Sequence, residues 1–274
     1  MNKLHFDYCM QLDYAVEVSK CNYTIKCIPQ NNARQTIERM KIELYPDTPY
    51  HEGVDGLRNR QIYGANDEPH LSFTFRITGE VLAGNADYEE RADEDIAMIF
   101  SHPHGLNIAG EDIRKYYEKI RKEIGAIIRL DRDTQADNLL LAKVIMHYLH
   151  NDFHYQTNST NVNTSAEEAF ALGHGVCQDY AHIFIALLHL VKIPARYVTG
   201  LIVGEGASHA WVEVLHNGKW YGLDPTNDVA VSDEHIKIGI GRDAHDCMIN
   251  RGIMHGGGCH KQTVHANVEI MGEK

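Results

Sequence analysis

Cys177 is the one cysteine of the chain whose position in a patterned segment suits a nucleophile. It begins the run CQDYAHIFIALLHLVKIP, in which apolar residues recur at three- and four-residue intervals as far as Pro194. This spacing predicts a helix that starts near Cys177 and stops before the proline. A thiol in the first turn lies near the positive end of the helix dipole, which favours the nucleophilic thiolate. Buried cysteines are otherwise small inert core residues, so the prediction depends on partners.

The partners are predicted on a β-hairpin centred on Asn217-Gly218, a strong signal for a two-residue turn. Such a turn places residues opposite each other when their numbers sum to 435, so Trp211 faces Asp224. His209 points to the same side as Trp211, because strand side chains alternate between faces. His209 and Asp224 are then diagonal neighbours within side-chain reach. The chain thus holds the parts of a thiol nucleophile, a general base and an orienting carboxylate.

The segments that carry these residues resemble the motifs of a known enzyme family. GVCQDYAHIF, KIPARYVTG, SHAWVEV and LDPTN, with GIGRDAHDC and RGIMHGGGCH after them, are similar to the successive motifs of the bacterial transglutaminase-like family, a branch of the papain-like thiol enzymes. The match runs from about Asp152 to the end of the chain. It implies that Cys177 is the nucleophile, His209 the general base and Asp224 the orienting carboxylate.

The chain departs from the family pattern at three positions outside these residues. Lys192 stands where the family usually has glycine, Leu201 where an aromatic residue is common, and Ala244 where tyrosine is usual. The three departures concern the surroundings of the site, and the residues with proposed chemical roles are all present.

Acyl transfer also needs hydrogen-bond donors for the oxyanion. The backbone N–H of Cys177 is one. Papain-like enzymes and transglutaminases place a polar side chain from upstream as a second donor, and the resemblance implies Gln156 or Tyr155 in that role, with Gln156 favoured. For Trp211 we expect core packing, with a place in the substrate groove as the less common alternative.

The first part of the chain has the period-two pattern of strands. Apolar and polar residues alternate over 4–10, 40–44 and 71–77, and turn-rich segments lie at 29–33, 46–55 and 64–68. A fourth alternating stretch, 264–270, predicts a final strand. We place a domain boundary after residue 83, beside Gly84.

Helical patterns dominate the middle of the chain. Apolar stripes predict helices over 112–127 and 134–149, and a capping box at Ser165–Glu168 begins a short helix that ends at Gly173. The prediction is an α+β protein, with an N-terminal antiparallel β-domain (1–83) followed by a transglutaminase/papain-like cysteine-enzyme core (84–274).

The composition limits the partners. A net charge of −12 without a cluster of Lys or Arg argues against nucleic acid and anionic membranes as partners. The N-terminal residues lack the apolar core of a signal peptide, and no stretch reaches the length of a membrane span. We therefore expect a cytoplasmic protein whose six cysteines are free thiols.

Eighteen histidines suggest a possible metal site, above all in the segment with the largest cluster of ligand-type residues. That segment holds His245, Cys247, His255, Cys259 and His260. Its spacing matches no zinc motif, and the three glycines within it predict a flexible loop. There is also no calcium-binding loop of the D-x-D-x-D-G type. We expect neither a metal nor a cofactor.

The expected activity is acyl transfer on an amide bond of a peptide or protein through a cysteinyl thioester. Water as the second nucleophile would make the protein a peptidase, amidase or deamidase, whereas an amine would make it a transglutaminase. Hydrolysis is favoured because water wins unless the site excludes it. The alternative from another class is an inactive peptide-binding module on the same fold. The sequence leaves the oligomeric state open.

Overall fold

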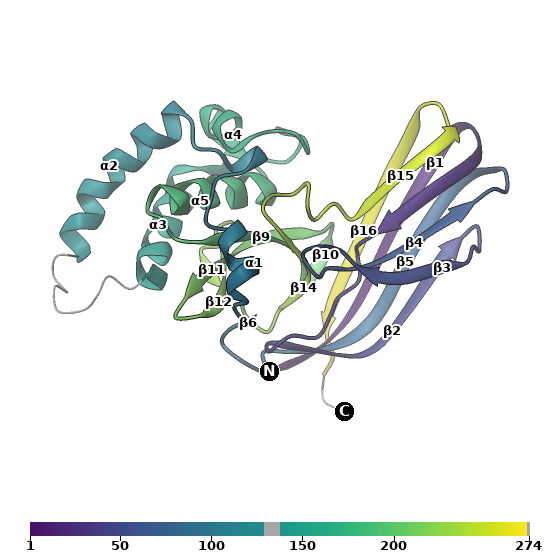
Figure 1. The fold of residues 1–274 in the computed structure, drawn as a ribbon, viewed down its shortest axis with the longest axis horizontal. Coiled ribbons are helices and arrows are strands. Elements are labelled where there is room, and N and C mark those ends of the chain that lie inside the picture. Colours follow the sequence, from purple (N-terminus) through teal and green to yellow (C-terminus); the bar gives the residue numbers. More distant parts are fainter. Residues whose placement is uncertain (129–137, 273–274) are drawn as a thin grey trace.

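The computed structural model describes residues 1–128 and 138–272, which form two antiparallel sheets and a group of helices (Figure 1). The first sheet contains β1 (Asn2–Ile25), β2 (Gln35–Tyr45), β3 (Tyr50–Val54), β4 (Arg60–Asn66), β5 (His70–Ala83), β10 (Gly204–Gly206), β15 (Asn250–Gly256) and β16 (His260–Ile270). The second contains β6 (Glu90–Arg91), β9 (Ala195–Ile202), β11 (His209–His216), β12 (Lys219–Asp224), β13 (Val229–Ala230) and β14 (His235–Gly241).

Helices lie on both faces of the second sheet, since the first helix packs with Trp211 and Trp220 and most of the others pack on the opposite face, with Val212. They are α1 (Glu94–Ile99), a 3-10 turn (Gly105–Asn107), α2 (Glu111–Ile128), α3 (Asn138–Asp152), α4 (Ala166–Leu172) and α5 (Cys177–Leu190). A short parallel pair, β7 (His154–Tyr155) and β8 (His174–Gly175), lies beside them. None of the helices within the described ranges has the length and apolar character that crossing a bilayer requires. The fold class predicted from the sequence is confirmed: an α+β core behind an antiparallel β-region.

The long strand β1 organises the first sheet. Its first half pairs with β5 and β16, and its second half pairs with β4 and β15. The alternation that predicted strands in this region corresponds to one buried face, to which Leu4, Phe6 and Tyr8 belong. The turn-rich segment 46–55 nevertheless contains β3, whose side chains are mostly exposed and therefore give no alternating pattern.

The first sheet includes strands from both ends of the chain, and it shares a buried core with the second sheet. β15 and β16 pair with β1, and Leu201, Ile236 and Ile238 of the second sheet lie in the same buried apolar cluster as the first sheet's inner face. The expected domain boundary after residue 83 therefore does not coincide with the division into sheets, because β15 and β16, within 250–270, belong to the first sheet. Pairing between strands more than two hundred residues apart leaves no trace in local periodicity.

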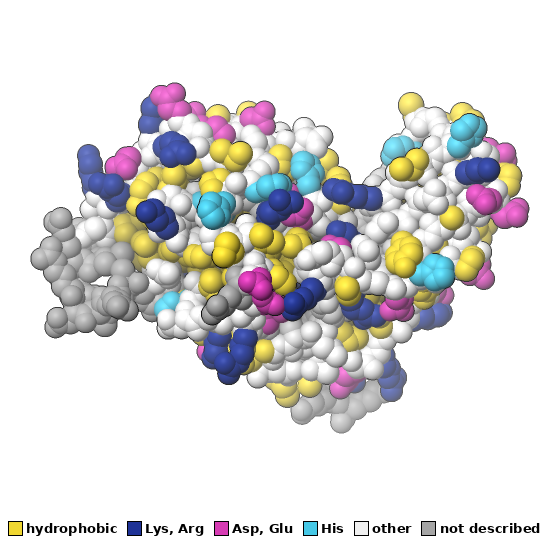
Figure 2. Space-filling model, viewed as in Figure 1, with side chains coloured by type: hydrophobic (Ala, Val, Ile, Leu, Met, Phe, Trp, Pro, Cys, Tyr) yellow, Lys and Arg dark blue, Asp and Glu magenta, His cyan; other side chains and the backbone are white. Residues whose placement is uncertain are grey.

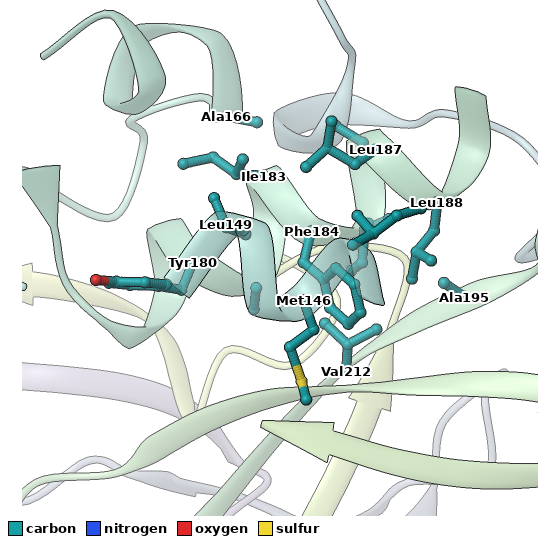
Figure 3. Packing of buried hydrophobic residues seen from close by; sticks show 14 of the residues in the cluster. Met146, Leu149, Ala166, Tyr180, Ile183, Phe184, Leu187, Leu188, Ala195 and Val212 are labelled. Carbon is teal, nitrogen blue, oxygen red and sulfur yellow. The ribbon is translucent and has the colours of Figure 1, made fainter. Parts of the chain in front are cut away.

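Helix α5 lies at the centre of the second region, packed against α2, α3, α4 and the sheet (Figure 3). Its neighbours include Met146 and Leu149 of α3 and Val212 of β11. The sequence predicted one apolar face, but every residue from 179 to 188 is buried, because α5 is enclosed on all sides. Each buried leucine or phenylalanine stabilises the fold by about 1.5–3 kcal/mol, so α5 is a rigid support for its first residue.

The ends of the helices follow their sequence signals. α5 ends at Leu190, and Lys192 has φ 60, a left-handed conformation that favours glycine; this explains why glycine is usual at that position of the family. Ser165 and Glu168 form the predicted capping box, and Gly173 ends α4 with φ 76. α2 agrees with the predicted helix, whereas the first four residues predicted for α3, 134–137, lie outside the described residues.

Candidate active site

The first turn of α5 holds Cys177 at the edge of the helical layer. The Val176 N–H donates to Asp179 Oδ2 at 2.8 Å, and the Thr160 hydroxyl donates to the same oxygen at 2.6 Å. Asp179 is buried, and burial raises the pKa of its carboxyl group. A Cβ at Gly175 would lie 2.5 Å from Asp179 Oδ2, so only glycine fits beside this carboxyl group. Asp179 thus fixes the backbone next to the half-buried Cys177, a structural role as expected.

The hairpin has the register predicted from its turn. Val212 pairs with Leu223 and His216 with Lys219, and both turn residues have positive φ (Asn217 48°, Gly218 70°), as a type I′ turn requires. β11 begins at His209 and β12 ends at Asp224. The ring nitrogen Nε2 of His209 lies 2.7 Å from Asp224 Oδ2, so the structure joins the predicted imidazole and carboxylate.

His209 contacts both other predicted residues. Burial lowers the pKa of His209, but hydrogen bonds with Asp224 and Cys177 outweigh burial and raise that pKa to about 10. Since Asp224 occupies Nε2, the contact with Cys177 falls to the other ring nitrogen, Nδ1. A cationic imidazole next to the sulfur favours the thiolate. The arrangement can therefore hold a thiolate and an imidazolium side by side.

Asp224 is fully buried and surrounded by donors. Its Oδ1 accepts from the backbone N–H of Thr226 at 3.0 Å and that of Asn227 at 3.3 Å, and its Oδ2 accepts from the Asn227 side chain at 2.7 Å. Burial alone would raise the pKa of Asp224. Hydrogen bonds from His209, His235 and Asn227 outweigh burial and hold the pKa well below its usual range. The carboxylate is ionised and fixed in orientation.

His235, the first residue of β14, is a member of this site that sequence reasoning missed. Its Nε2 lies 3.4 Å from Asp224 Oδ2, and the backbone N–H of Ser232 points at its Nδ1 from 3.3 Å. An amide N–H can only donate, so Nδ1 accepts and Nε2 carries the proton toward Asp224. The buried run HIKIGIG was the only available signal.

Trp211 does not line a groove, contrary to the second expectation for it. Its side chain is fully buried, and its ring packs edge-on against His235 at 5.4 Å between centroids and lies 6.2 Å from that of His209. A Cβ at Gly200 would come within 2.1 Å of the indole, so the neighbouring strand has glycine where the ring lies. Trp211 therefore packs beside the imidazole rings of His235 and His209 and helps to hold them in place.

The two residues expected as oxyanion donors lie next to the start of helix α5. β7 pairs with β8, and the Gln156 N–H donates to the Gly175 carbonyl at 2.8 Å, which brings this segment close to Cys177. Burial and the charge of Cys177 both raise the pKa of Tyr155, so its phenol is near the sulfur. The Gln156 side chain is exposed. Both residues stay candidates for the role.

The histidine-rich C-terminal segment has a different structure from the predicted flexible loop. Gly256, Gly257 and Gly258 all have positive φ and form the turn between β15 and β16. Within the described ranges, one group of three metal-ligand side chains lies together, formed by His209, Asp224 and His235. Two histidines and a carboxylate are a possible donor set for a transition metal. The hydrogen bonds between the rings and the carboxylate already satisfy the same atoms.

Comparisons with known proteins find similar sequences and a similar fold. Residues 128–225 match the model of the transglutaminase-like superfamily. An uncharacterized protein of Mycobacterium leprae is 30% identical over 258 residues, 84% of this chain and 85% of that protein. One from Mycobacterium tuberculosis is 36% identical over 123 residues, 39% of each chain. The structure of a candidate cysteine protease from Cytophaga hutchinsonii is 22% identical and covers 100% of this chain and 92% of its own, with a TM-score of 0.77.

Proposed function

The chain belongs to the transglutaminase-like superfamily, and from this premise we propose that it is a thiol enzyme that acts on amide bonds of peptides or proteins. Cys177 is the nucleophile, His209 the general acid and base, and Asp224 the residue that orients His209. The observation that carries the proposal is the chain of contacts from the Cys177 thiol through the His209 ring to the buried Asp224 carboxylate.

The reaction follows from these contacts. The Cys177 thiolate attacks the amide carbonyl carbon, the C–N bond breaks, and His209 gives its proton to the leaving amine. The product is a thioester on Cys177. Because Cys177 begins α5, its N–H has no acceptor within the helix and is available to the oxyanion. Tyr155 or Gln156 supplies the second donor.

We propose that water completes the reaction. Water attacks the thioester while His209 takes a proton, the C–S bond breaks, and the acid leaves. Hydrolysis is supported by the exposure of the site, since Cys177 is only half buried and Tyr155 is 56% exposed. A site that transfers acyl groups to amines must exclude water.

Selective alkylation tests the nucleophile. Iodoacetamide at neutral pH should modify Cys177 far faster than the other five cysteines, and His209→Ala should abolish the difference. The exposed Cys259 is the internal control. Equal labelling of Cys177 and Cys259 in the unaltered protein would support an inactive binding module instead.

The fate of the thioester needs a second experiment. A mixture of peptides is incubated with the protein, with and without a labelled primary amine, and analysed by mass spectrometry. Shortened or deamidated peptides are expected in both samples. Amine adducts in place of these products would establish a transglutaminase, and unchanged peptides in every sample would refute the proposed activity.

A further inference from the structure

A cavity opens between the two sheets directly beside the proposed nucleophile. Its volume is about 380 Å³, and its walls include Gln178 and Ser208, the chain neighbours of Cys177 and His209. The opposite wall comes from the first sheet, where Gln262 and Val264 of β16 line it. Figure 2 shows the notch in the surface between the helical part and the raised end of the first sheet. A peptide bound at Cys177 would meet both sheets here.

The cavity carries no permanent charge. Asp, Glu, Lys and Arg make up 23% of the chain, yet none of them is among the described residues that line this cavity. Amide and hydroxyl groups supply its polarity, as in Gln178, Thr199 and Gln262, and side chains such as Val264 supply its apolar surface. His245 is the one imidazole, and its Nε2 lies 3.2 Å from Asn163 Oδ1. A charged substrate side chain would lose water here without gaining an ionic partner, which is costly.

The first sheet places Gln262 where it can control this selection. β16 pairs with β1, and three of its residues also pair with β10. β10 comes shortly before His209 in the chain. Gln262 and Val264 point to the cavity, whereas Thr263 points to the opposite face, because strand residues alternate. Gln262 is exposed and outside the buried core. A charged residue in place of Gln262 therefore changes the electrostatic potential of the cavity without disturbing the packing of the core.

We propose that this cavity is a substrate subsite that accepts uncharged peptide side chains near the reacting amide, and that Gln262 of the first sheet sets this preference. The inference rests on the proposed thiol chemistry and adds a substrate class to it. The first sheet is then part of the substrate site rather than a separate appendage.

The test is a charge exchange read out on a peptide library. The unaltered protein should process peptides in which Asp, Glu, Lys and Arg are all depleted at one position near the reacting amide. In Gln262→Glu, Lys and Arg should become acceptable at that position, with kcat/KM relative to uncharged residues rising by roughly tenfold or more. Gln262→Lys should do the same for Asp and Glu.

Thr263→Glu is the matched control, since it places the same charge one residue away on the other face of β16. Iodoacetamide labelling of Cys177 in each variant verifies that the site is intact. No depletion of charged residues in the unaltered protein, or the same shift in Thr263→Glu as in Gln262→Glu, would overturn the inference alone. Absence of any processed peptide, despite selective labelling, would overturn the proposed function and this inference with it.

Discussion

Two buried carboxylates lie on one face of the second sheet, on either side of Trp211, and their partners differ. Asp224 accepts hydrogen bonds from the imidazoles of His209 and His235. Glu213 lies two residues beyond Trp211 on β11 and so on the same face. It accepts from Arg196 Nε at 2.7 Å and from Lys237 Nζ, also at 2.7 Å. Both carboxylates are fully buried.

The two groups differ in the chemistry of their positive partners. The Arg196 guanidinium is permanently charged, stacks on Trp220 at 4.2 Å and also pairs with Glu90 of β6, at the end of the connection from the first sheet. His209 is titratable and contacts a sulfur. A buried carboxylate paired with cations that keep their charge holds two regions of the fold together. A buried carboxylate paired with an imidazole that contacts a thiol can support proton transfer.

The largest expected effect separates the two carboxylates by activity. Asp224→Asn should lower kcat by about 10⁴-fold, as removal of the orienting charge does in hydrolytic triads. The melting temperature should also fall, because the charge that raises the pKa of His209 is lost, but the amide retains most of the packing and the variant should stay folded. Steady-state kinetics and thermal unfolding of the same preparation measure both. Activity within tenfold of the unaltered protein would remove Asp224 from the proposed mechanism.

The second prediction concerns stability. Glu213→Gln removes the carboxylate that contacts both buried cations, those of Arg196 and Lys237, and leaves Glu90 and Glu89 as the acidic groups near them, which should cost about 3–5 kcal/mol in the free energy of unfolding. The activity of the protein that stays folded should change by only a few-fold. Urea unfolding and active-site labelling test this. A variant as stable as the unaltered protein but inactive would contradict the division into a fastening group and a chemical group.

His235 sharpens the comparison, because it touches the carboxylate and not the sulfur. His235→Leu should lower kcat by roughly 10–100-fold. The loss of its hydrogen bond should raise the pKa of Asp224, which shifts the acid limb of the pH–rate profile to higher pH. His235→Gln, whose amide can still donate, should restore most of the activity and the original limb. An unchanged acid limb in the leucine variant would make His235 a packing residue only.

The last prediction concerns alkaline pH, and its effect at neutral pH is the smallest of the four. The pKa of His209 is raised above 6.5 in the folded protein to about 10. Its contribution to stability is therefore complete below about pH 6.5 and is lost as the pH rises through about 10. Activity should fall over the same pH range, while the ion pair of Arg196 with Glu213 persists. Activity measured against pH, with circular dichroism as the control, tests this. A limb below pH 8 would contradict the coupling of His209 to Asp224.

The parts of the site that could be predicted from the sequence are those with local signals. Asn217-Gly218 fixes the hairpin register and hence brings His209 to Asp224, and the apolar period fixes where α5 begins. His235 escaped because its position depends on the pairing of β14 with β9. The pairing of Glu213 with Arg196 depends likewise on the register between β11 and β9. Neither register leaves a mark in any short stretch of residues.

The fold was predictable to the same extent. Alternation located β1, β5 and β16, but not the length of β1 or the return of β15 and β16 to it. β15 carries glycines and mostly exposed side chains, so its segment has the composition of a loop. The expected place of Trp211 in a groove failed for a similar reason, because Gly200, on the neighbouring strand, makes the buried space for its ring.

The pairing of β10 with β16 has a consequence for biosynthesis. β10 leads into His209, and β16 lies after all three proposed catalytic residues in the chain. During translation the thiol and the imidazole therefore leave the ribosome before the strand that braces them. The surroundings of the proposed site are therefore complete only after β16 has been synthesised and has joined β1.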